Sequence, residues 1–501
     1  MLWVLPRDVS DHCPLVLKVE GWVWGPKLFR FNNYWLENRK INEVVEDSWN
    51  SHNLRGWMGF VLKEKLKVLK GRLRDWNKEE YGRMDTRITT LMEDIEELDV
   101  KGEATQLNEE DVRIRKEKFI TLWSLLKAKD SLLFQRSRVK WLKEGDANTS
   151  FFHNNVKARS KGNAVKALKV NDEWFQAPVE VRRVVVEYFT SQVMTDGSVR
   201  PTLDEVPFDM LTDEQILITP FMGEEIEEVV KLSDGNKSPG SDGFNFAFIK
   251  KFWPLLKDEV RIMFDQFHAN EVIPKSLLAY FVTLIPKVSS PMTLKDFRPI
   301  SLLGCLYKLL AKVLTKRLAS VMDSIISKSQ SAFIKGRNLV DGVLVANELV
   351  DFAKKTKSKC LVLKVDFEKA YDSVDWGFLE YMMKRLGFGE KGVAWMKACV
   401  FGGTMSIHVN GSPTEELNIQ RGLKQGDPLA PFLFLMVAEG FGRLMRNAVR
   451  LNLFEGFRFR REGMVISHLQ YADDTICFGK ATVDNLWTLK ALLQGFQMAQ
   501  A

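Results

Sequence analysis

Two short stretches decide the fold, LVLKVD at residues 361–366 and YADD at residues 471–474. The first is an apolar run rich in β-forming residues, which predicts a buried strand that ends at Asp366. The second lies between two further strand-like runs and predicts the tight turn of a β-hairpin. If these strands are neighbours in one sheet, the carboxylates of Asp366, Asp473 and Asp474 converge.

Two adjacent carboxylates in a tight turn repel each other, and a bound divalent cation removes that cost. Asp366, Asp473 and Asp474 offer the hard oxygen ligands that suit Mg²⁺. Two such ions can activate a hydroxyl group and stabilise a leaving pyrophosphate in an in-line displacement. An acidic pair in a turn is more often an ordinary solvated cap, so the interpretation as a metal site depends on the rest of the sequence.

The sequence on either side of these stretches predicts both helices and strands. Apolar residues recur with helical spacing in four segments, 376–386, 393–400, 432–445 and 485–500. A strand-like run at 405–409 is followed by Asn410 and Gly411, a pair that favours a hairpin turn. We therefore expect an α+β fold, in which an antiparallel sheet carries helices on one face, and not a βαβ array.

The upstream region, residues 38–143, is rich in Lys, Glu and Leu and contains no proline. Its apolar spacing predicts long helices with a break near Gly102. The positions that carry this spacing are Leu62, Leu66, Leu69, Leu73 and Trp76. Residues 127–144 add six basic side chains with interleaved aromatic residues. A solvated helix face and a contact with phosphate groups are both consistent with that pattern.

Length and composition bound the class of protein. The 501 residues suggest about three domains, and 45% hydrophobic, 11% aromatic and 27% charged residues are ordinary for a globular chain, which excludes a collagen-like or mostly disordered protein. The longest apolar run, 429–438, is too short to cross a bilayer, and the N-terminus has no signal-peptide pattern. We expect a soluble intracellular protein. The net charge of +7 permits a polyanionic partner without requiring one.

Motifs along the chain resemble those of one enzyme family. In order they are KVDFEKAYD at 364–372, GLKQGDPL at 422–429 and YADD at 471–474. Together they resemble the reverse transcriptases of LINE-type non-LTR retrotransposons, specifically the plant form of that polyprotein. Further segments that resemble the family are KSPGSDGF at 237–244, LIPK at 284–287, DFRPISL at 296–302, QSAF at 330–333 followed by Gly336 and Arg337, and the linker motif WLKEGD at 141–146.

The resemblance implies a right-hand polymerase with fingers and palm, preceded by a long helical region. The implied parts are a remnant of the C-terminal end of an endonuclease at 1–36, a helical linker region at 37–160, a connecting segment at 161–223, the fingers at 224–360 and a truncated palm at 361–501. The resemblance also implies that the chain is cut at both ends and that the thumb is missing.

The same resemblance assigns roles to individual residues. Asp366, Asp473 and Asp474 match the family's catalytic triad, which holds two Mg²⁺ ions, with Mn²⁺ as a possible substitute. Tyr371 falls where an aromatic ring excludes the ribose 2′-hydroxyl, and a core tyrosine is the alternative.

The remaining nucleotide-binding candidates lie in the loop and the fingers. Gln425 and Gly426 match the loop that lies against the incoming nucleotide, where glycine permits close backbone approach. Arg298 is the candidate contact to the triphosphate, because a guanidinium group binds phosphate oxygens bidentately. Lys287 is a second candidate, and a solvated surface lysine explains it equally well.

The implied function is RNA-directed DNA polymerase activity, in which deoxynucleotides are joined to a primer 3′ end. The expected partners are an RNA template, a DNA primer and dNTPs, with no membrane, and the expected location is the nucleus or the cytoplasm. The alternative is a catalytically incompetent remnant that binds nucleic acid through the basic helices and the fingers near Arg298 and Arg337. Asp11 and His12 resemble the last endonuclease motif, and we expect them to be vestigial, since this pair alone cannot build a metal site.

Overall fold

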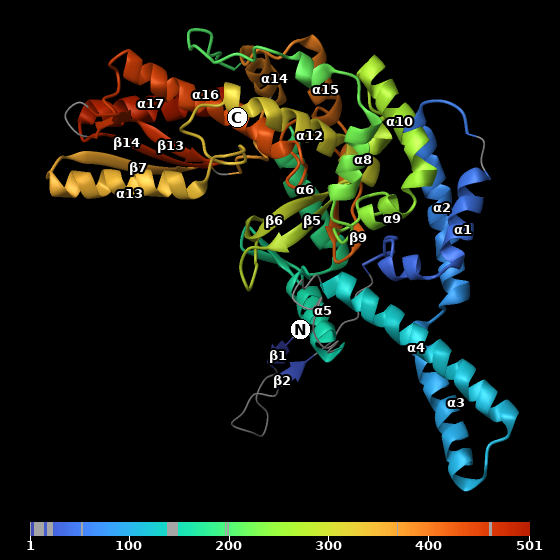
Figure 1. Cartoon of the computed structure of the whole chain (residues 1–501). Helices are drawn as coiled ribbons and strands as arrows, with labels where there is room; N and C mark the ends of the chain where they lie inside the picture. Colours follow the sequence, from blue (N-terminus) through green and yellow to red (C-terminus); the bar gives the residue numbers. More distant parts are fainter. Residues whose placement is uncertain are drawn as a thin grey trace, which may run out of the picture.

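The computed structural model of the chain describes residues 2–4, 15–17, 24–51, 54–137, 149–195, 197, 200–367, 369–459 and 463–500. Asp11, His12 and the motif at 141–146 lie outside these residues, so the expectations for them stay predictions. Figure 1 shows a helical region, two main sheets and the helices that join them.

The helical region contains long helices, as the sequence predicts. They are α1 (Lys40–Asn50), α2 (Met58–Glu80), α3 (Met84–Ala104), α4 (Glu109–Ser137) and α5 (Thr149–Gly162). The five apolar positions with helical spacing all lie on α2 and are all buried. The break expected near Gly102 is confirmed, because α3 ends at Ala104 and α4 begins at Glu109.

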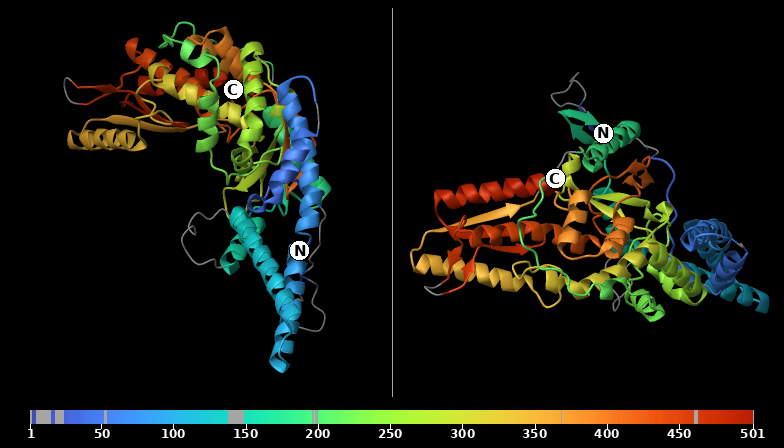
Figure 2. Two further views of the ribbon diagram at one scale, coloured as in Figure 1. Left: turned by 45° about the vertical axis from the view of Figure 1, so that its right-hand side comes forward. Right: turned by 90° about the horizontal axis from the view of Figure 1, so that it is seen from above.

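Helices α3 and α4 form a two-helix arm that projects from the rest of the molecule (Figure 1 and Figure 2). Ion pairs join the two helices along their length. They link Lys101 to Asp111, Arg115 to Asp99, Lys118 to Asp94 and Lys129 to Asp85. These pairs are exposed to solvent, which screens the attraction and keeps their contribution to stability small. The pairs fix how the two helices align more than they add stability.

The segment before α1 belongs to the core of the molecule. Phe31 is fully buried, its backbone N–H donates to the carbonyl of Gly243 over 2.8 Å, and its ring lies 5.3 Å from that of Phe248. The short helix η1 (Asn33–Glu37) follows directly. Residues 24–37 therefore join the helical region to the part of the chain that begins near residue 224.

Helices connect the two main sheets and cover them. They are α6 (Pro178–Val193), α7 (Gln215–Ile218), α8 (Gly223–Leu232), α9 (Phe246–Lys251), α10 (Trp253–Asn270), α11 (Lys275–Leu278), η3 (Leu294–Asp296), α12 (Cys305–Ile325), α14 (Trp376–Arg385) and α15 (Glu390–Val400). The predicted helices at 376–386 and 393–400 correspond to α14 and α15. Among these elements α12 is buried along most of its length.

The first main sheet has five strands. They are β5 (Tyr280–Pro286), β6 (Phe297–Leu302), β8 (Thr404–Val409), β9 (Ser412–Pro413) and β10 (Leu417–Asn418). Their order is β10-β8-β5-β6, with β9 beside β8, and β5 and β8 are parallel. The predicted hairpin turn is confirmed, since Asn410 and Gly411 both have positive φ between β8 and β9. This sheet joins strands from the proposed fingers (224–360) and the proposed palm (361–501).

The second main sheet is antiparallel and contains both stretches that decide the fold. Its strands are β7 (Cys360–Asp366), β13 (His468–Tyr471) and β14 (Asp474–Lys480), in the order β13-β14-β7. The strand that ends at Asp366, the hairpin around YADD and their pairing in one sheet are thus confirmed. The prediction that the first of these strands is buried is wrong, because β7 is an edge strand whose residues are all half-buried or exposed.

The prediction of helices on one face of the sheet is wrong for this second sheet. Figure 1 shows α13 (Leu339–Lys355) along one side of it and α16 (Ala430–Arg450) and α17 (Val483–Gln500) along the other. The cause is visible on β14, where Cys477 packs in the cluster that includes α16 and α17, while its neighbour Phe478 packs in the cluster with α13. A strand that is apolar on both faces needs cover on both faces.

Three small hairpins complete the fold. They are β1 (Leu2–Val4) with β2 (Leu15–Leu17), β3 (Leu168–Val170) with β4 (Glu173–Phe175), and β11 (Phe457–Arg458) with β12 (Val465–Ile466). The apolar run at 429–438 lies at the start of α16 and is buried in the core. Among the described residues, no helix combines the length and the apolar character needed to cross a membrane.

Candidate active site

The candidate site is centred on two carboxylates at the ends of adjacent strands. Asp366 on β7 and Asp474 on β14 are direct cross-strand partners, and both side chains are exposed. Partners in register lie on the same face of a sheet, so the carboxyl groups of Asp366 and Asp474 face the same side. Lys364, two residues before Asp366, forms a 3.1 Å ion pair with Asp474, and the hydrogen bond and the negative charge of that carboxylate raise the pKa of the lysine.

Asp473 lies in the two-residue turn that joins β13 to β14. The other turn residue, Ala472, has φ of +54°, in the left-handed region that a non-glycine residue rarely adopts. This backbone conformation reverses the chain within two residues, so Asp473 directly precedes Asp474 at the tip of the hairpin. Asp366 and Asp474 thus face each other, and Asp473 lies beside them in sequence and at the same end of the sheet.

Tyr371 lies close to this turn. Its ring stacks on Phe434 of α16, with centroids 4.6 Å apart and an angle of 22° between the planes. Burial raises the pKa of Tyr371 to about 12, and the negative charge of Asp473 adds to the increase. The phenol is therefore protonated and uncharged at neutral pH. Tyr371 thus lies within electrostatic reach of Asp473.

The loop at 422–427 lies between Tyr371 and the five-stranded sheet. The N–H of Leu423 donates to the carbonyl of Tyr371 over 2.7 Å, and the N–H of Ser301 on β6 donates to the carbonyl of Gln425 over 2.8 Å. Gly426 has φ of +103°, a conformation that side-chain-bearing residues rarely adopt, which explains the glycine at this position. The loop is therefore fixed on both sides, by the segment after β7 and by β6.

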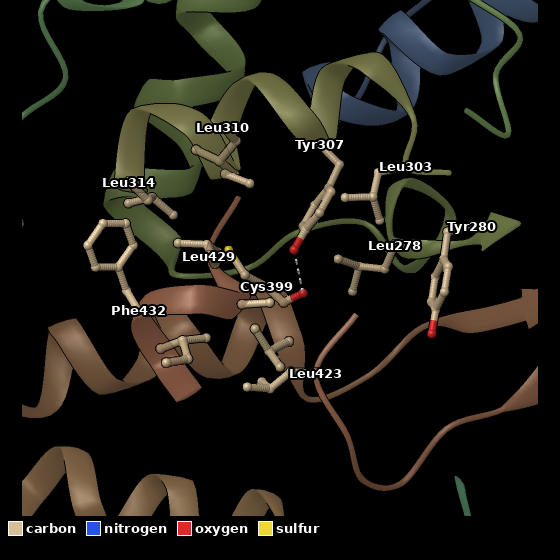
Figure 3. Close-up of a cluster of buried hydrophobic side chains, with 14 of the residues drawn as sticks. Leu278, Tyr280, Leu303, Tyr307, Leu310, Leu314, Cys399, Leu423, Leu429 and Phe432 are labelled. Atoms are coloured by element: carbon tan, nitrogen blue, oxygen red, sulfur yellow. Dashed lines mark hydrogen bonds between the residues drawn. The ribbon is translucent and has the colours of Figure 1, made fainter. Parts of the chain in front are cut away.

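Two charged side chains of the same loop, Lys424 and Asp427, are buried and anchor the loop through polar contacts. The ammonium group of Lys424 donates to the carbonyl of Cys399 over 3.1 Å and lies 4.8 Å from the centre of the Tyr307 ring. The hydroxyl of Tyr307 lies 2.5 Å from a carboxylate oxygen of Asp427 and 3.2 Å from the Cys399 carbonyl, the contact drawn in Figure 3. Burial lowers the pKa of Lys424 and raises that of Asp427.

Figure 3 also shows the apolar side chains that surround Tyr307, among them Leu303, Leu423 and Leu429. Leu303 lies just before α12, Leu423 lies in the loop, and Leu429 directly precedes α16. Because they are buried, the polar contacts of Tyr307 are shielded from water, which strengthens them. The loop with Gln425 and Gly426 thus rests on a rigid base.

The two basic candidates lie at the edge of the first sheet. Arg298 on β6 is exposed, and no ion pair links it to another described residue. Lys287 follows β5, is exposed, and donates from its ammonium group to the carbonyl of Lys295 over 3.0 Å. Arg298 is therefore available to a ligand, whereas Lys287 already has a local partner.

Comparison with known proteins agrees with these observations. Residues 285–499 match a protein family described as reverse transcriptase (RNA-dependent DNA polymerase). The match includes both strands and the turn that carry the three aspartates. This part of the chain is therefore similar to reverse transcriptases.

The similar proteins come from transposable elements. The chain is 28% identical, over 95% of its length and 37% of the relative's, to the transposon TX1 uncharacterized 149 kDa protein of Xenopus laevis. It is 32% identical to a Pol polyprotein from retrotransposable element R2 of Popillia japonica, over 44% of this chain and 30% of the relative. The chain thus spans about a third of these relatives. These matches support a LINE-type reverse transcriptase region.

A shorter similarity leads to a plant protein. Over 67 residues, 13% of this chain and 55% of the relative, the chain is 40% identical to an uncharacterized mitochondrial protein of Arabidopsis thaliana.

Reverse transcriptases generally use divalent metal ions, so we tested whether the aspartates of the reverse transcriptase region fit such ions. Their chemistry fits, because carboxylate oxygens are preferred ligands of Mg²⁺ and two of the three groups face the same side of one sheet. Within the described part of the chain, however, no three His, Cys, Asp or Glu side chains are already arranged around a common metal position. The carboxylate of Asp474 forms an ion pair with Lys364 instead.

Two residues near the site have properties that the motif reading did not assign. Burial raises the pKa of Asp372, next to Tyr371, to about 6, against the opposing charges of Lys369 and Lys287. Its position directly after Tyr371 in a motif was the only signal available in the sequence. Arg337, expected to offer a basic surface, is instead only 9% exposed in its side chain and donates to the carboxylate of Asp323 and to four backbone carbonyls.

Proposed function

We propose that this chain is the reverse transcriptase region of a plant LINE-type element and adds deoxynucleotides to a primer 3′ end on an RNA template. The observation that carries the proposal is the pairing of Asp366 with Asp474, with Asp473 in the adjoining turn beside Tyr371. The family match over residues 285–499 supports the activity, and the similarity to an Arabidopsis protein supports the plant origin. Such a reaction takes place inside the cell, in the nucleus or the cytoplasm.

In this proposal Asp366, Asp473 and Asp474 would hold two divalent ions. When bound, such ions activate the 3′-hydroxyl and stabilise the leaving pyrophosphate. Mg²⁺ is the expected ion and Mn²⁺ a substitute. The contribution of the protein is to aim the carboxylates at one point, which the cross-strand register of β7 and β14 supports.

Four further residues would bind the incoming nucleotide. The ring of Tyr371 would lie against its sugar and exclude a 2′-hydroxyl. The backbone of Gln425 and Gly426 would approach its base, since glycine leaves room for close contact. Arg298 would bind the triphosphate with its guanidinium group, which is exposed and in no ion pair with a described residue. Lys287 is a weaker candidate because its ammonium group already has a backbone partner.

The division into fingers at 224–360 and palm at 361–501 is part of the same proposal. The three-stranded sheet would be the core of the palm, because Asp366 and Asp474 lie on its strands and Asp473 lies in the turn between two of them. The five-stranded sheet contains strands from both ranges, so the two parts would share one sheet and move little relative to each other.

A second function, binding of nucleic acid without catalysis, is favoured by one observation. The carboxylates are not arranged around a common metal position, and Lys364 occupies one of them. A remnant of an element would bind a primer-template through its exposed basic groups and leave the primer unextended.

Primer extension separates the two functions. The purified chain is incubated with poly(rA), oligo(dT) and dTTP in Mg²⁺ or Mn²⁺, and products are resolved on a gel. We expect extension by the wild type, none by Asp473→Asn, and wild-type extension by Asp258→Asn, which changes an exposed aspartate on α10. Binding of the duplex without extension in either metal would establish the remnant. Extension that persists in Asp473→Asn would exclude this turn as the catalytic site.

A further inference from the structure

We propose that Gln330 is a positioning residue, which holds the turn with Asp473 and Asp474 in its working conformation. The proposal rests on the function proposed above only in naming what the turn is for. Gln330 lies in the loop between α12 and α13, more than a hundred residues before the turn, and its side chain is 1% exposed.

The amide group of Gln330 binds both polar backbone groups of Ala472. Its oxygen accepts from the N–H of Ala472 over 3.0 Å, and its nitrogen donates to the carbonyl of Ala472 over 3.3 Å. The same oxygen accepts from the N–H of Ala332 over 3.0 Å, which fixes the orientation of the amide. The Gln330 side chain therefore provides hydrogen-bond partners for both the N–H and the carbonyl of Ala472.

Ala472 needs such a partner for two reasons. It is buried, with 7% exposure, so water cannot replace the lost hydrogen bonds of its backbone. Its φ of +54° is disfavoured for a residue with a side chain, and the conformation persists only where the surroundings enforce it. The amide of Gln330 fits the backbone in this conformation, so it selects the turn that aims the following two carboxylates.

The loop that carries Gln330 is itself held firmly. The N–H of Gln470 on β13 donates to the carbonyl of Ser329 over 2.7 Å, and the N–H of Ser331 donates to the carbonyl of Gln470 over 3.0 Å. Arg337 donates to the carbonyl of Gln330 itself over 2.7 Å. The loop thus runs beside β13 like a short extra strand. The backbone that carries the Gln330 side chain is therefore held in place relative to the turn.

The consequence is an effect on chemistry that is larger than the effect on nucleotide binding. A displacement of reacting groups by about 1 Å can lower a rate about 100-fold. Among the described residues, no hydrogen bond joins Gln330 to Tyr371, Gln425 or Arg298, so nucleotide binding through these three residues should persist. Replacing Gln330 should therefore lower kcat and leave KM for dNTP nearly unchanged.

The test compares Gln330→Met with a matched control, Gln135→Met. Gln135 on α4 also binds backbone on both sides of its amide, since it accepts from the N–H of Asn33 and donates to the carbonyl of Phe31, both over 3.0 Å. In primer extension we expect kcat of Gln330→Met to fall about 100-fold with KM for dTTP unchanged, and kcat of Gln135→Met to stay at the wild-type value. An unchanged kcat in folded Gln330→Met would overturn the proposal. If Gln330→Met does not fold, Gln330→Asn, whose amide is one methylene too short, carries the same expectation.

Two measurements that need no activity separate this proposal from the proposed function. In hydrogen exchange, the amides of residues 470–476 should exchange faster in Gln330→Met than in the wild type and in Gln135→Met. Mn²⁺ affinity, followed by electron paramagnetic resonance, should fall about tenfold or more, the usual effect of losing a group that orients metal ligands. If the wild type does not extend a primer but the exchange result holds, the proposed function fails and the positioning role stands. Unchanged exchange at 470–476 would overturn the role whatever the activity.

Discussion

At the residue scale, Tyr371 connects three parts of the candidate site. Its carbonyl accepts from the loop with Gln425, its ring stacks on α16 through Phe434, and the charge of Asp473 acts on its phenol. A ring held on one face by stacking has little freedom to move aside for a bulkier sugar. This rigidity is what a steric filter against ribonucleotides needs.

We therefore predict that Tyr371→Ala admits ribonucleotides. Removal of the ring opens space for a 2′-hydroxyl, and the preference for dTTP over UTP on poly(rA) and oligo(dT) should fall about tenfold or more, equivalent to about 1.4 kcal/mol of discrimination. The ratio of kcat/KM values for the two nucleotides measures this preference.

Tyr371→Phe is the control for that experiment. The phenylalanine ring keeps the stacking on Phe434 and the steric filter, so the preference for dTTP should stay at the wild-type level. If Tyr371→Ala discriminates as well as the wild type, Tyr371 is a core tyrosine and another group selects the sugar.

At the element scale, the parts of the fold that depend on local pattern are those the sequence predicts. The strand ending at Asp366 and the turn at Asn410 and Gly411 follow from runs of three to seven residues, and the structure contains both. The presence of helices on both faces of the second sheet could also have been predicted from the sequence. The continuous apolar run at 476–478 indicates a strand that is buried on both faces, whereas alternating apolar and polar residues would indicate a strand buried on one face.

Contacts between distant elements could not be predicted in this way. The sequence contains no signal that Gln330 reaches Ala472, because hydrogen bonds between residues 142 positions apart depend on the finished packing. The sequence likewise contains no signal that the Arg337 side chain is buried against the protein's own backbone and is not available at the surface. A motif identifies which residue types occur together, but it does not specify whether a cation contacts phosphate or the protein's own backbone.

Strand β13 also carries a pH dependence. His468 is buried, and its ring nitrogens contact the hydroxyls of Ser329 over 3.0 Å and Ser467 over 2.9 Å. Burial lowers the pKa of His468 to about 3, and the charge of Arg446 acts in the same direction. As the pH falls below about 6.5, this histidine takes up a proton in the unfolded chain but stays neutral in the folded chain. It therefore contributes stability above pH 6.5 that is lost as the pH falls.

We predict that acid destabilises the wild type more steeply than His468→Gln. Below about pH 6, the histidine alone should lower the free energy of unfolding by about 1.4 kcal/mol per pH unit, and the variant should lack this slope. Urea unfolding at pH 7, 6 and 5 for both proteins gives the two slopes. Parallel slopes would mean that His468 takes up a proton in the folded state at its ordinary pKa.

At the scale of the whole molecule, the residues of the candidate site are distributed over the two main sheets and the loop between them. The aspartates come from the three-stranded sheet, and Arg298 comes from the five-stranded sheet. The loop with Gln425 bridges them, through Tyr371 on one side and Ser301 on the other. A substrate bound at this junction would touch parts of the chain that are far apart in sequence, so the site exists only when the entire region is folded.

The distribution of free positive charge over the whole molecule leads to the last prediction. Two lysines of the basic stretch are already paired on α4, since Lys127 pairs with Glu37 over 2.9 Å and Lys129 pairs with Asp85 over 2.8 Å. Arg298 has no such partner among the described residues. Each phosphate contact releases counterions and contributes about 0.7 to 0.9 to the slope of log affinity against log salt concentration.

Binding of an RNA and DNA duplex should therefore weaken as salt increases, and the two basic regions should differ in their share of this effect. We expect Arg298→Ala to lower the salt slope by about one, the loss of one phosphate contact, and the double substitution of Lys127 and Lys129 by Gln to leave it unchanged. Fluorescence anisotropy of a labelled duplex at several salt concentrations measures both slopes. The opposite result, a lower salt slope in the double variant and an unchanged slope in Arg298→Ala, would place the nucleic acid on α4. In that case the ion pairs with Glu37 and Asp85 would have to open so that the two lysines could contact the phosphate backbone.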